Sequence, residues 1–434
     1  MNGSRRWLAV LVRFRIAIII VAALVALLVL DGSHLAFLLG ILIFVVALLG
    51  SVMLHEFGHF VTAKKFGMQV TQFFVGFGTT LWSMVVGETE YGIKALPFGG
   101  FVKITGMTRM EEIDVADEPR SFRNQPGWQR MIVLAAGSFM HFVLALFLLF
   151  LLAVGVGQSN SNTNVVSSVA ACVPASVKAL NSNNPCQSGP LVQSPAERAG
   201  LKANDKIISI AGHPIANWNQ LHTVLKSQKP DVKLPMVVQR AGRDVTLSVT
   251  LAAIPNRAVP YLGVEPAVLY QRQNPWSAIK FAGTQFGQTL TSSASALGKL
   301  PSAIPDLFAK NRASTAAGQV SSVVGVGDVT GDVVESSIPW QSKATLVLYL
   351  IASLNIFVGA FNLLPLLPLD GGHLAVVIYE RIRAWFARLR GRPDPGLVDI
   401  QKLVPVSLLV FAVLVGVGTL LIAADIFNPV HLQV

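Results

Sequence analysis

An uncharged run from Ala36 to Leu54 leads without a break into His55-Glu56-Phe-Gly-His59, and this combination constrains the chain more than any other feature. An apolar run of this length is typical of a helix that crosses a lipid bilayer. On a helix, His55 and His59 lie four residues apart on one face, so both imidazoles can bind one zinc ion. Polar groups are costly at the end of a membrane helix. That cost favours a functional site over two buried histidines that merely cap the helix.

The composition supports a membrane protein, because 52% of the residues are hydrophobic and only 13% are charged. The net charge of +11 does not indicate a nucleic-acid partner. The basic residues gather beside apolar runs instead of forming a cluster with interleaved aromatic side chains, which is typical of orientation in a membrane. We therefore expect the lipid bilayer, and no nucleic acid, as a partner. Neither of the two cysteines belongs to a CxxC pair, so a thiolate zinc site is excluded.

Five apolar runs predict five membrane spans, and basic residues flank each end that this topology places in the cytoplasm. The first run is short, and a signal peptide is the alternative, but no small-x-small cleavage site follows cleanly. His55 lies ~28 Å into the second span, which places the site inside the membrane near its cytoplasmic face. The long polar region between the third and fourth spans is expected outside the cytoplasm. The predicted spans are 16–30, 36–61, 131–157, 344–369 and 403–424.

The same patterns divide the chain into five parts. The alternation from Thr89 to Leu96 predicts a strand in a small β-region on the cytoplasmic membrane surface, with an ordinary connecting loop as the alternative. In the external region, a capped helix at 194–201 and strands at 205–212, 234–239 and 245–251 predict an α+β domain. The parts are an additional N-terminal span (1–35), the first part of the membrane core (36–157), the external domain (164–255), a connecting region (256–342) and the second part of the core (343–434).

Two further features of the external region leave alternatives open. A weakly amphipathic helix that starts at Pro275 could lie on the outer membrane interface or be an ordinary soluble helix. Cys172 and Cys186 could form a disulfide in an oxidising compartment, and two free thiols are the alternative.

A catalytic zinc site needs three protein ligands and one open position, so a third ligand must join His55 and His59. Asp370 lies at the inner end of the predicted fourth span, where an isolated carboxylate is hard to keep charged without a cation. Glu88 and Glu90 are the alternatives, but both can be solvated without penalty. Asp370 is therefore the favoured ligand, with Zn²⁺ as the cofactor.

These residues resemble a known family. The HExxH motif, together with Asn362-Leu-Leu-Pro-Leu-Leu-Pro-Leu-Asp370-Gly-Gly, is similar to the motifs of the site-2 protease family of intramembrane zinc proteases. Gly76-Phe-Gly78 and Pro97-Phe-Gly-Gly-Phe-Val102 resemble its membrane-associated β-region, and 194–212 resembles a bacterial PDZ domain. The resemblance implies a polytopic α-helical membrane protein with about five transmembrane helices, a membrane-associated β-region and an inserted α+β PDZ-like domain.

The resemblance also implies an activity. It is closest to actinobacterial members, and bacterial members with an extracytoplasmic PDZ domain cleave anti-sigma factors that a first protease has already trimmed. Glu56 would then be the general base of peptide-bond hydrolysis, and Asn362 would bind the oxyanion or the substrate backbone. The expected process is regulated intramembrane proteolysis of transmembrane substrates in the plasma membrane, and the oligomeric state is left open.

The chain departs from the family at three places. The usual Gly-Pro-x-x-Asn reads Gly137-Ser-Phe-Met-His141 here, the span 16–30 is additional, and no carboxylate-binding loop precedes Ser194. His141 is expected to be a packed histidine or an extra polar group near the site. Two other classes compete with a protease. A transporter would also have broken helices with polar groups, but no repeated half is visible. A PDZ-bearing scaffold with an inactive site would lack zinc.

Overall fold

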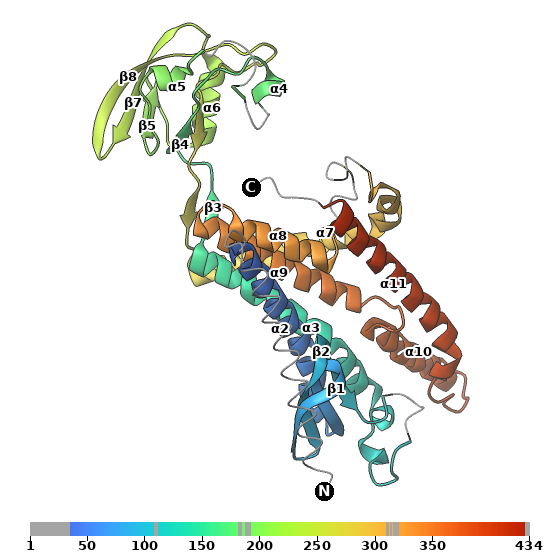
Figure 1. The fold of residues 1–434 in the computed structure, drawn as a ribbon. Coiled ribbons are helices and arrows are strands. Elements are labelled where there is room, and N and C mark those ends of the chain that lie inside the picture. The colour runs from blue at the N-terminus through green and yellow to red at the C-terminus, as the bar shows by residue number, and fades with distance from the viewer. Residues whose placement is uncertain are drawn as a thin grey trace. The chain divides into compact units, whose positions relative to one another are not determined.

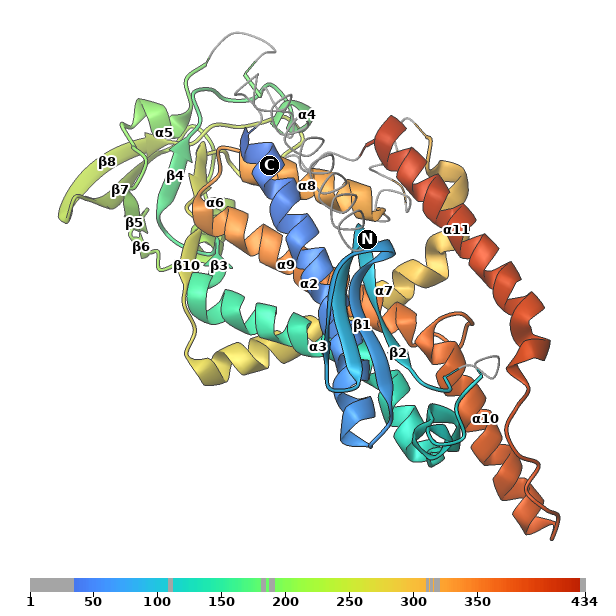
Figure 2. The same ribbon diagram turned by 60° about the horizontal axis from the view of Figure 1, so that its bottom comes forward.

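The computed structural model describes residues 35–107, 112–180, 185–186, 192–309, 312, 315 and 321–429. The predicted span 16–30 lies outside the described residues. The chain divides into two compact units, one that runs to Gly155 and resumes at Asn274, and one from Val156 to Gln273. Figures 1 and 2 show the elements of both units, and each unit is described by itself below.

Four helices of the larger unit are long and apolar enough to cross a membrane. Among the described residues these candidate spans are α2 (Leu35–Lys65), α3 (Gly127–Leu151, continued by a π-helical turn to Val156), α9 (Trp340–Asn362) and α11 (Val404–Phe427). They correspond to the predicted spans that begin at 36, 131, 344 and 403. Large apolar side chains such as Leu42, Phe147 and Leu409 are exposed on them, as expected of helices that face lipid. The protein is therefore a multi-pass membrane protein.

The prediction that the fourth span continues to residue 369 is wrong. α9 ends at Asn362, and Asp370 is the first residue of a separate helix, α10 (Asp370–Leu389). Pro365 and Pro368 lie in the connection, where each lacks a backbone N–H and disfavours helical geometry in the residue before it. The consequence is that Asp370 is presented by the N-terminus of a new helix and not by the end of a span.

A long antiparallel hairpin connects α2 to α3. It consists of β1 (Val70–Val86) and β2 (Thr89–Ile104), with Val86 opposite Thr89 at the turn and Phe73 opposite Val102 farther along. Gly87 takes a positive φ of 65° in the turn, which suits glycine. The predicted strand at 89–96 is confirmed, and β1 contains Gly76–Gly78 of the predicted β-region, although no separate strand was predicted over 70–86. The hairpin packs beside α2, as both ribbon views show (Figures 1 and 2).

Two further α-helices belong to the larger unit. α7 (Pro275–Ala303) confirms the predicted helix at Pro275, and the Asn274 side chain caps it by accepting a hydrogen bond from the N–H of Ser277 over 2.9 Å. α8 (Val323–Glu335) was not predicted, because its glycines lower helix propensity. Glycines on both helices allow α8 to pack closely on α2: a Cβ added at Gly331 of α8 would collide with the Phe37 ring, and one added at Gly40 of α2 would lie 2.6 Å from the carbonyl oxygen of Thr330.

The smaller unit is α+β. A four-stranded antiparallel sheet has the order β6–β5–β7–β8, and β4 pairs with β9 while β3 pairs with β10. Its own hydrophobic core includes Ile207, Met236 and Val249, all fully buried. The predicted helix at 194–201 and strands at 205–212, 234–239 and 245–251 are present as α5, β5, β7 and β8. The elements are β3 (Gln158–Asn160), β4 (Val166–Val169), α4 (Val177–Leu180), α5 (Pro195–Arg198), β5 (Lys206–Ile210), β6 (His213–Pro214), α6 (Trp218–Ser227), β7 (Lys233–Arg240), β8 (Arg243–Thr250), β9 (Val264–Pro266) and β10 (Leu269–Gln271).

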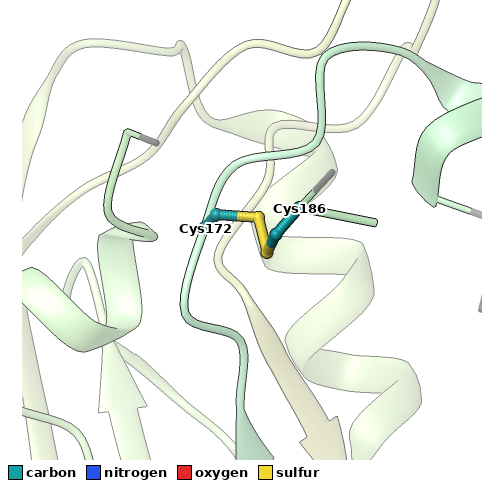
Figure 3. The surroundings of a disulfide bond; sticks show 2 residues. All are labelled: Cys172 and Cys186. Atoms are coloured by element: carbon teal, nitrogen blue, oxygen red, sulfur yellow. A yellow bond between two sulfur atoms is a disulfide. The ribbon is translucent and has the colours of Figure 1, made fainter. Parts of the chain in front are cut away.

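The two cysteines of the chain are joined in this unit. Cys172 and Cys186 form a disulfide, shown in Figure 3, which confirms the first of the two alternatives for this pair. A disulfide closes the loop between its cysteines and typically stabilises a small domain by about 2–4 kcal/mol.

Candidate metal centre

His55 and His59 lie one turn apart on α2, and Asp370 reaches them from the first residue of α10. The Nε2 atoms of the two imidazoles are 3.2 Å apart, and each lies 3.2 Å from the Oδ2 atom of Asp370. Both histidines are buried. Residues that are more than 300 positions apart in the sequence thus form one compact group, the only such group of three potential ligands within the described ranges.

The geometry of this group fits zinc. A tetrahedral site with bonds of about 2.0–2.1 Å places its ligand atoms about 3.3–3.4 Å apart, close to the spacing seen here. The Nδ1–H of His59 donates to the carbonyl oxygen of Val133 over 2.7 Å, which leaves the Nε2 lone pair directed at the group. The Oδ2 atom of Asp370 is buried and accepts no hydrogen bond from the described residues. Three acceptor atoms therefore face one another in a buried place, and a cation bound between them would offset the cost of burying them.

The third span leaves no room for a side chain beside this group. A Cβ atom added at Gly137 of α3 would collide with the His59 Nε2 atom and with the His55 ring. Glycine at this position lets the backbone of α3 approach the imidazoles closely. The residue belongs to the Gly137–His141 motif, so the sequence marked the position but not the reason for it.

Glu56 faces the hairpin. Its Oε2 atom accepts a hydrogen bond from the backbone N–H of Val102 in β2 over 3.0 Å. Glu56 is next to His55 in sequence, and its carboxylate is not one of the three clustered ligands. A carboxylate in this place can accept a proton beside the metal position without binding the metal itself.

The two alternative third ligands are engaged elsewhere. Glu88 accepts hydrogen bonds from both terminal guanidinium nitrogens of Arg120, at 2.7 and 2.9 Å, and from Lys64 at 2.5 Å. These bonds, first from Arg120 and then from Lys64, lower the pKa of Glu88 to about 2. Glu90 accepts a hydrogen bond from the amide of Gln72 over 3.1 Å. Neither carboxylate lies in the group formed by His55, His59 and Asp370.

Asn362 is the last residue of α9, and its side chain is half-buried. In the part of the chain that the structure describes, this amide makes no hydrogen bond with the clustered ligands. It directly precedes the connection that leads to Asp370, so the two residues flank the same short segment.

A buried polar cluster next to the metal group was only partly foreseen. The Ser51 hydroxyl donates to the Oδ1 atom of Asn355, and the Nδ1 atom of His141 lies 2.8 Å from that oxygen and 3.0 Å from the Ser51 oxygen. The Asn355 amide donates to the carbonyl of Ile351, which identifies Oδ1 as the atom facing His141. The His141 ring lies 5.0 Å from the His55 ring between centroids. The cluster joins α2, α3 and α9 directly beside a candidate ligand.

One signal in the sequence could have found this cluster. Ser51 lies four residues before His55 and therefore on the same helix face, so its hydroxyl was bound to lie near the site. Asn355 is a polar residue inside the predicted span 344–369, but nothing in the sequence identifies its partners.

The fold and the site together define a membrane-embedded metallopeptidase. Residues 43–392 match the model of peptidase family M50. The chain is 34% identical over 412 residues to the zinc metalloprotease Rip1 of Mycobacterium tuberculosis, and the aligned residues cover 91% of this chain and 99% of that protein. It is 26% identical over 435 residues to the regulator of sigma-E protease RseP of Escherichia coli, with 80% and 92% covered. The chain belongs to peptidase family M50, the site-2 proteases.

Membership confirms the resemblance that the sequence suggested. The protein is a zinc metalloendopeptidase of the site-2 protease type, and its cofactor is Zn²⁺. The group of two histidines and one aspartate is chemically suited to that ion, since zinc prefers imidazole and carboxylate ligands in a tetrahedral arrangement.

Proposed function

We propose that the protein cleaves transmembrane segments of single-pass membrane proteins whose external parts have already been removed, with anti-sigma factors as the substrate class. The observation that carries the proposal is the triangle of acceptor atoms at 3.2 Å on helices that meet within a membrane protein. One relative is a regulator of sigma-E protease by name, which supports the substrate class.

In this proposal each residue of the site has one role. His55, His59 and Asp370 hold the zinc ion, which when bound polarises the scissile carbonyl and lowers the pKa of water. Glu56 takes the proton from the attacking water and passes it to the leaving amine. The Asn362 amide donates a hydrogen bond to the oxyanion or to the substrate backbone.

The substrate must be locally extended, because a helix hides its carbonyl groups in its own hydrogen bonds. Within the described residues, 72–75 of β1 pair with β2 on both sides, whereas 82–86 of β1 and 100–103 of β2 each have one strand partner. An edge of the hairpin at these singly paired residues can pair with an extended peptide. Its hydrogen bond to Glu56 connects the hairpin to the proposed base. We therefore propose that the hairpin holds the substrate as an added strand.

A direct test of the reaction is Glu56→Gln in protein reconstituted with a trimmed single-pass substrate. The variant should keep zinc and lose cleavage, because the amide cannot accept the proton. Cleavage at the normal rate would contradict the assigned base. Loss of zinc together with activity would assign Glu56 to metal binding instead.

The proposed orientation places residues 158–342 outside the cytoplasm and residues 62–130 and 380–402 inside it. Since Cys172 and Cys186 are joined, a single introduced cysteine can be labelled selectively. Ser159→Cys should react with an impermeant reagent in intact cells, and Asp394→Cys should react only after lysis. Equal labelling of both variants in intact cells would contradict this orientation.

For the external unit we propose a PDZ-like domain at 164–255 that excludes untrimmed substrates by its bulk. Recognition of the new C-terminus left by the first cut is the rival role. Deletion of 164–255 should permit cleavage of untrimmed substrate if the domain is a gate. If the domain instead recognises the new C-terminus, the deletion should slow cleavage of trimmed substrate. A folded, zinc-containing deletion variant that still rejects untrimmed substrate would contradict the gate.

A further inference from the structure

Helix α10 carries a continuous apolar stripe on the face that points away from the protein. At about 100° per residue, the six members of the stripe fall within about 60° on either side of Ile382. Trp385 is 56% exposed and Leu389 is 64% exposed, large fractions for such side chains. The buried Val377, Glu380 and Ala384 lie on the opposite face. The apolar stripe consists of Ile378, Tyr379, Ile382, Trp385, Phe386 and Leu389.

Arginines line both edges of the apolar stripe. Arg381 and Arg388 lie about 100–120° to one side of Ile382, and Arg383 and Arg390 lie about 80–100° to the other. Arg381, Arg388 and Arg390 are exposed, and within the described ranges none of the three forms a salt bridge. Arg383 is different, because it donates to the carbonyl oxygens of Pro395 and Gly396. Three cations therefore remain available to an external anion.

A buried ion pair places the stripe at the level of the membrane boundary. Arg130 lies in the first turn of α3, at the start of a candidate span, and its guanidinium contacts the Glu380 carboxylate over 2.9 Å. The other carboxylate oxygen of Glu380 accepts the N–H of Val398 over 2.7 Å, in the segment that leads to α11. α10 also stands in the chain between two candidate spans, α9 and α11. Because α3 is a candidate span, its first turn is expected at the membrane boundary, and the ion pair holds α10 against that turn.

We propose that the apolar stripe of α10 lies in the interfacial layer of the membrane and that its flanking arginines bind anionic phospholipid headgroups. Tyrosine and tryptophan prefer the interfacial layer, and arginine side chains can extend to headgroup phosphates while their methylene groups cover apolar surface. An amphipathic helix with basic edges and an aromatic face is typical of a helix that lies in that layer. The surface needs no protein partner. Because Asp370 is the first residue of α10, the lipid contact steadies the same helix that presents this carboxylate.

The test uses the full chain in nanodiscs, with an environment-sensitive fluorophore on Ile382→Cys. Selective labelling is possible because the two native cysteines are bonded. Replacing neutral with anionic phospholipid should shift the emission of the fluorophore to the blue. The same replacement should make the fluorophore accessible to a quencher attached to lipid. A label on Val115→Cys, a loop position that is 91% exposed, should respond to neither change.

Charge variants separate lipid binding from simple burial. Each Arg→Gln exchange at 381, 388 or 390 should weaken the response to anionic lipid about fivefold, since one such charge near an anionic surface contributes a factor of that size. The matched Arg→Lys exchanges keep the charge and should keep most of the response. Inorganic phosphate at equal ionic strength should not replace the lipid, which distinguishes a headgroup in a bilayer from a free anion.

Four results would overturn the proposal. Equal emission in neutral and anionic discs, or an Arg→Gln triple variant indistinguishable from the unchanged protein, would show that headgroup charge is not recognised. A blue shift that requires two protein copies per disc would assign the stripe to a second copy of the chain. A label that stays in a polar environment in both lipids would show that the stripe does not contact the membrane and would favour a soluble partner. None of these readouts depends on proteolysis, so they test the surface separately from the proposed reaction.

Discussion

The backbone N–H of Val102 donates a hydrogen bond to the Oε2 atom of Glu56 over 3.0 Å. This single contact links strand β2 to the helix that carries His55 and His59. A Cβ added at Gly100, two residues earlier, would lie 2.7 Å from the sulfur of Met53 and 3.6 Å from the Cγ atom of Glu56. The hairpin therefore lies directly on the helix turn that contains Glu56.

Val102→Pro should reduce cleavage and leave zinc bound, because proline removes the N–H that orients Glu56. A hydrogen bond to a charged group contributes about 1.5–3 kcal/mol, so we expect kcat to fall about 10- to 100-fold. Val102→Ala keeps the N–H and is the matched control. Normal kcat in the proline variant, with its zinc content unchanged, would show that this hydrogen bond does not matter for catalysis.

Gly137→Ala should impair zinc binding. The added methyl group would collide with His59 and His55 and displace one imidazole from the triangle. Moving one imidazole away from its position in the triangle should lower the zinc affinity by at least about tenfold. Competition with a chelator measures this affinity. Gly155→Ala is a control on the same candidate span, where an added Cβ meets nothing within 4 Å. Equal zinc affinity in the two variants would contradict the close approach of α3.

The cluster of Ser51, His141 and Asn355 should contribute to stability inside the membrane part. His141→Leu leaves buried polar atoms of Ser51 and Asn355 with fewer partners, at a cost of about 1–3 kcal/mol. His141→Asn keeps a donor and should recover part of the loss. Thermal unfolding in detergent measures both variants. A leucine variant as stable as the unchanged protein would mean that the cluster is not a stabilising network.

Acid should weaken the attachment of the hairpin to α2. The folded protein lowers the pKa of Glu88 from its ordinary 4.5 to about 2 through Arg120 and Lys64, so it favours the carboxylate. The resulting stability is present above about pH 4.5 and is lost as the pH falls toward 2. Glu88→Gln should reduce the pH dependence of the unfolding temperature between about pH 4.5 and pH 2. Salt should do the same in part, because the Glu88 side chain is 29% exposed. Identical pH slopes in both proteins would refute this role.

The sequence predicted the elements whose cause is local. Long uncharged runs produced α2, α3, α9 and α11, and alternating residues produced β5, β7 and β8. It failed where tertiary contact decides. Gly331 sits in α8 because that helix packs on Gly40 and Phe37 of α2, which outweighs the low helix propensity of glycine. In β1, glycines and polar residues such as Gln72, Thr79 and Ser83 interrupt the apolar residues without strict alternation, so the period-two strand signal of this segment is weak.

The site shows the same division. His55, Glu56 and His59 are neighbours on one helix, so their grouping follows from helix geometry alone. Asp370 was selected by the cost of an isolated carboxylate at membrane depth, and that argument needed no knowledge of its neighbours. For His141 the sequence was informative only in part: the spacing of Ser51 and His55 places Ser51 near the site, but the meeting of His141 with Ser51 of α2 and Asn355 of α9 depends on how the spans pack.

The central claim is that Asp370, and not Glu88, completes the zinc site with His55 and His59. Zinc content of the purified full-length protein, measured by elemental analysis, tests it most directly. Asp370→Ala should lose most of its zinc, as should His55→Ala and His59→Ala, whereas Glu88→Ala and Glu56→Gln should retain it. Full zinc content in Asp370→Ala together with loss of zinc in Glu88→Ala would contradict the account.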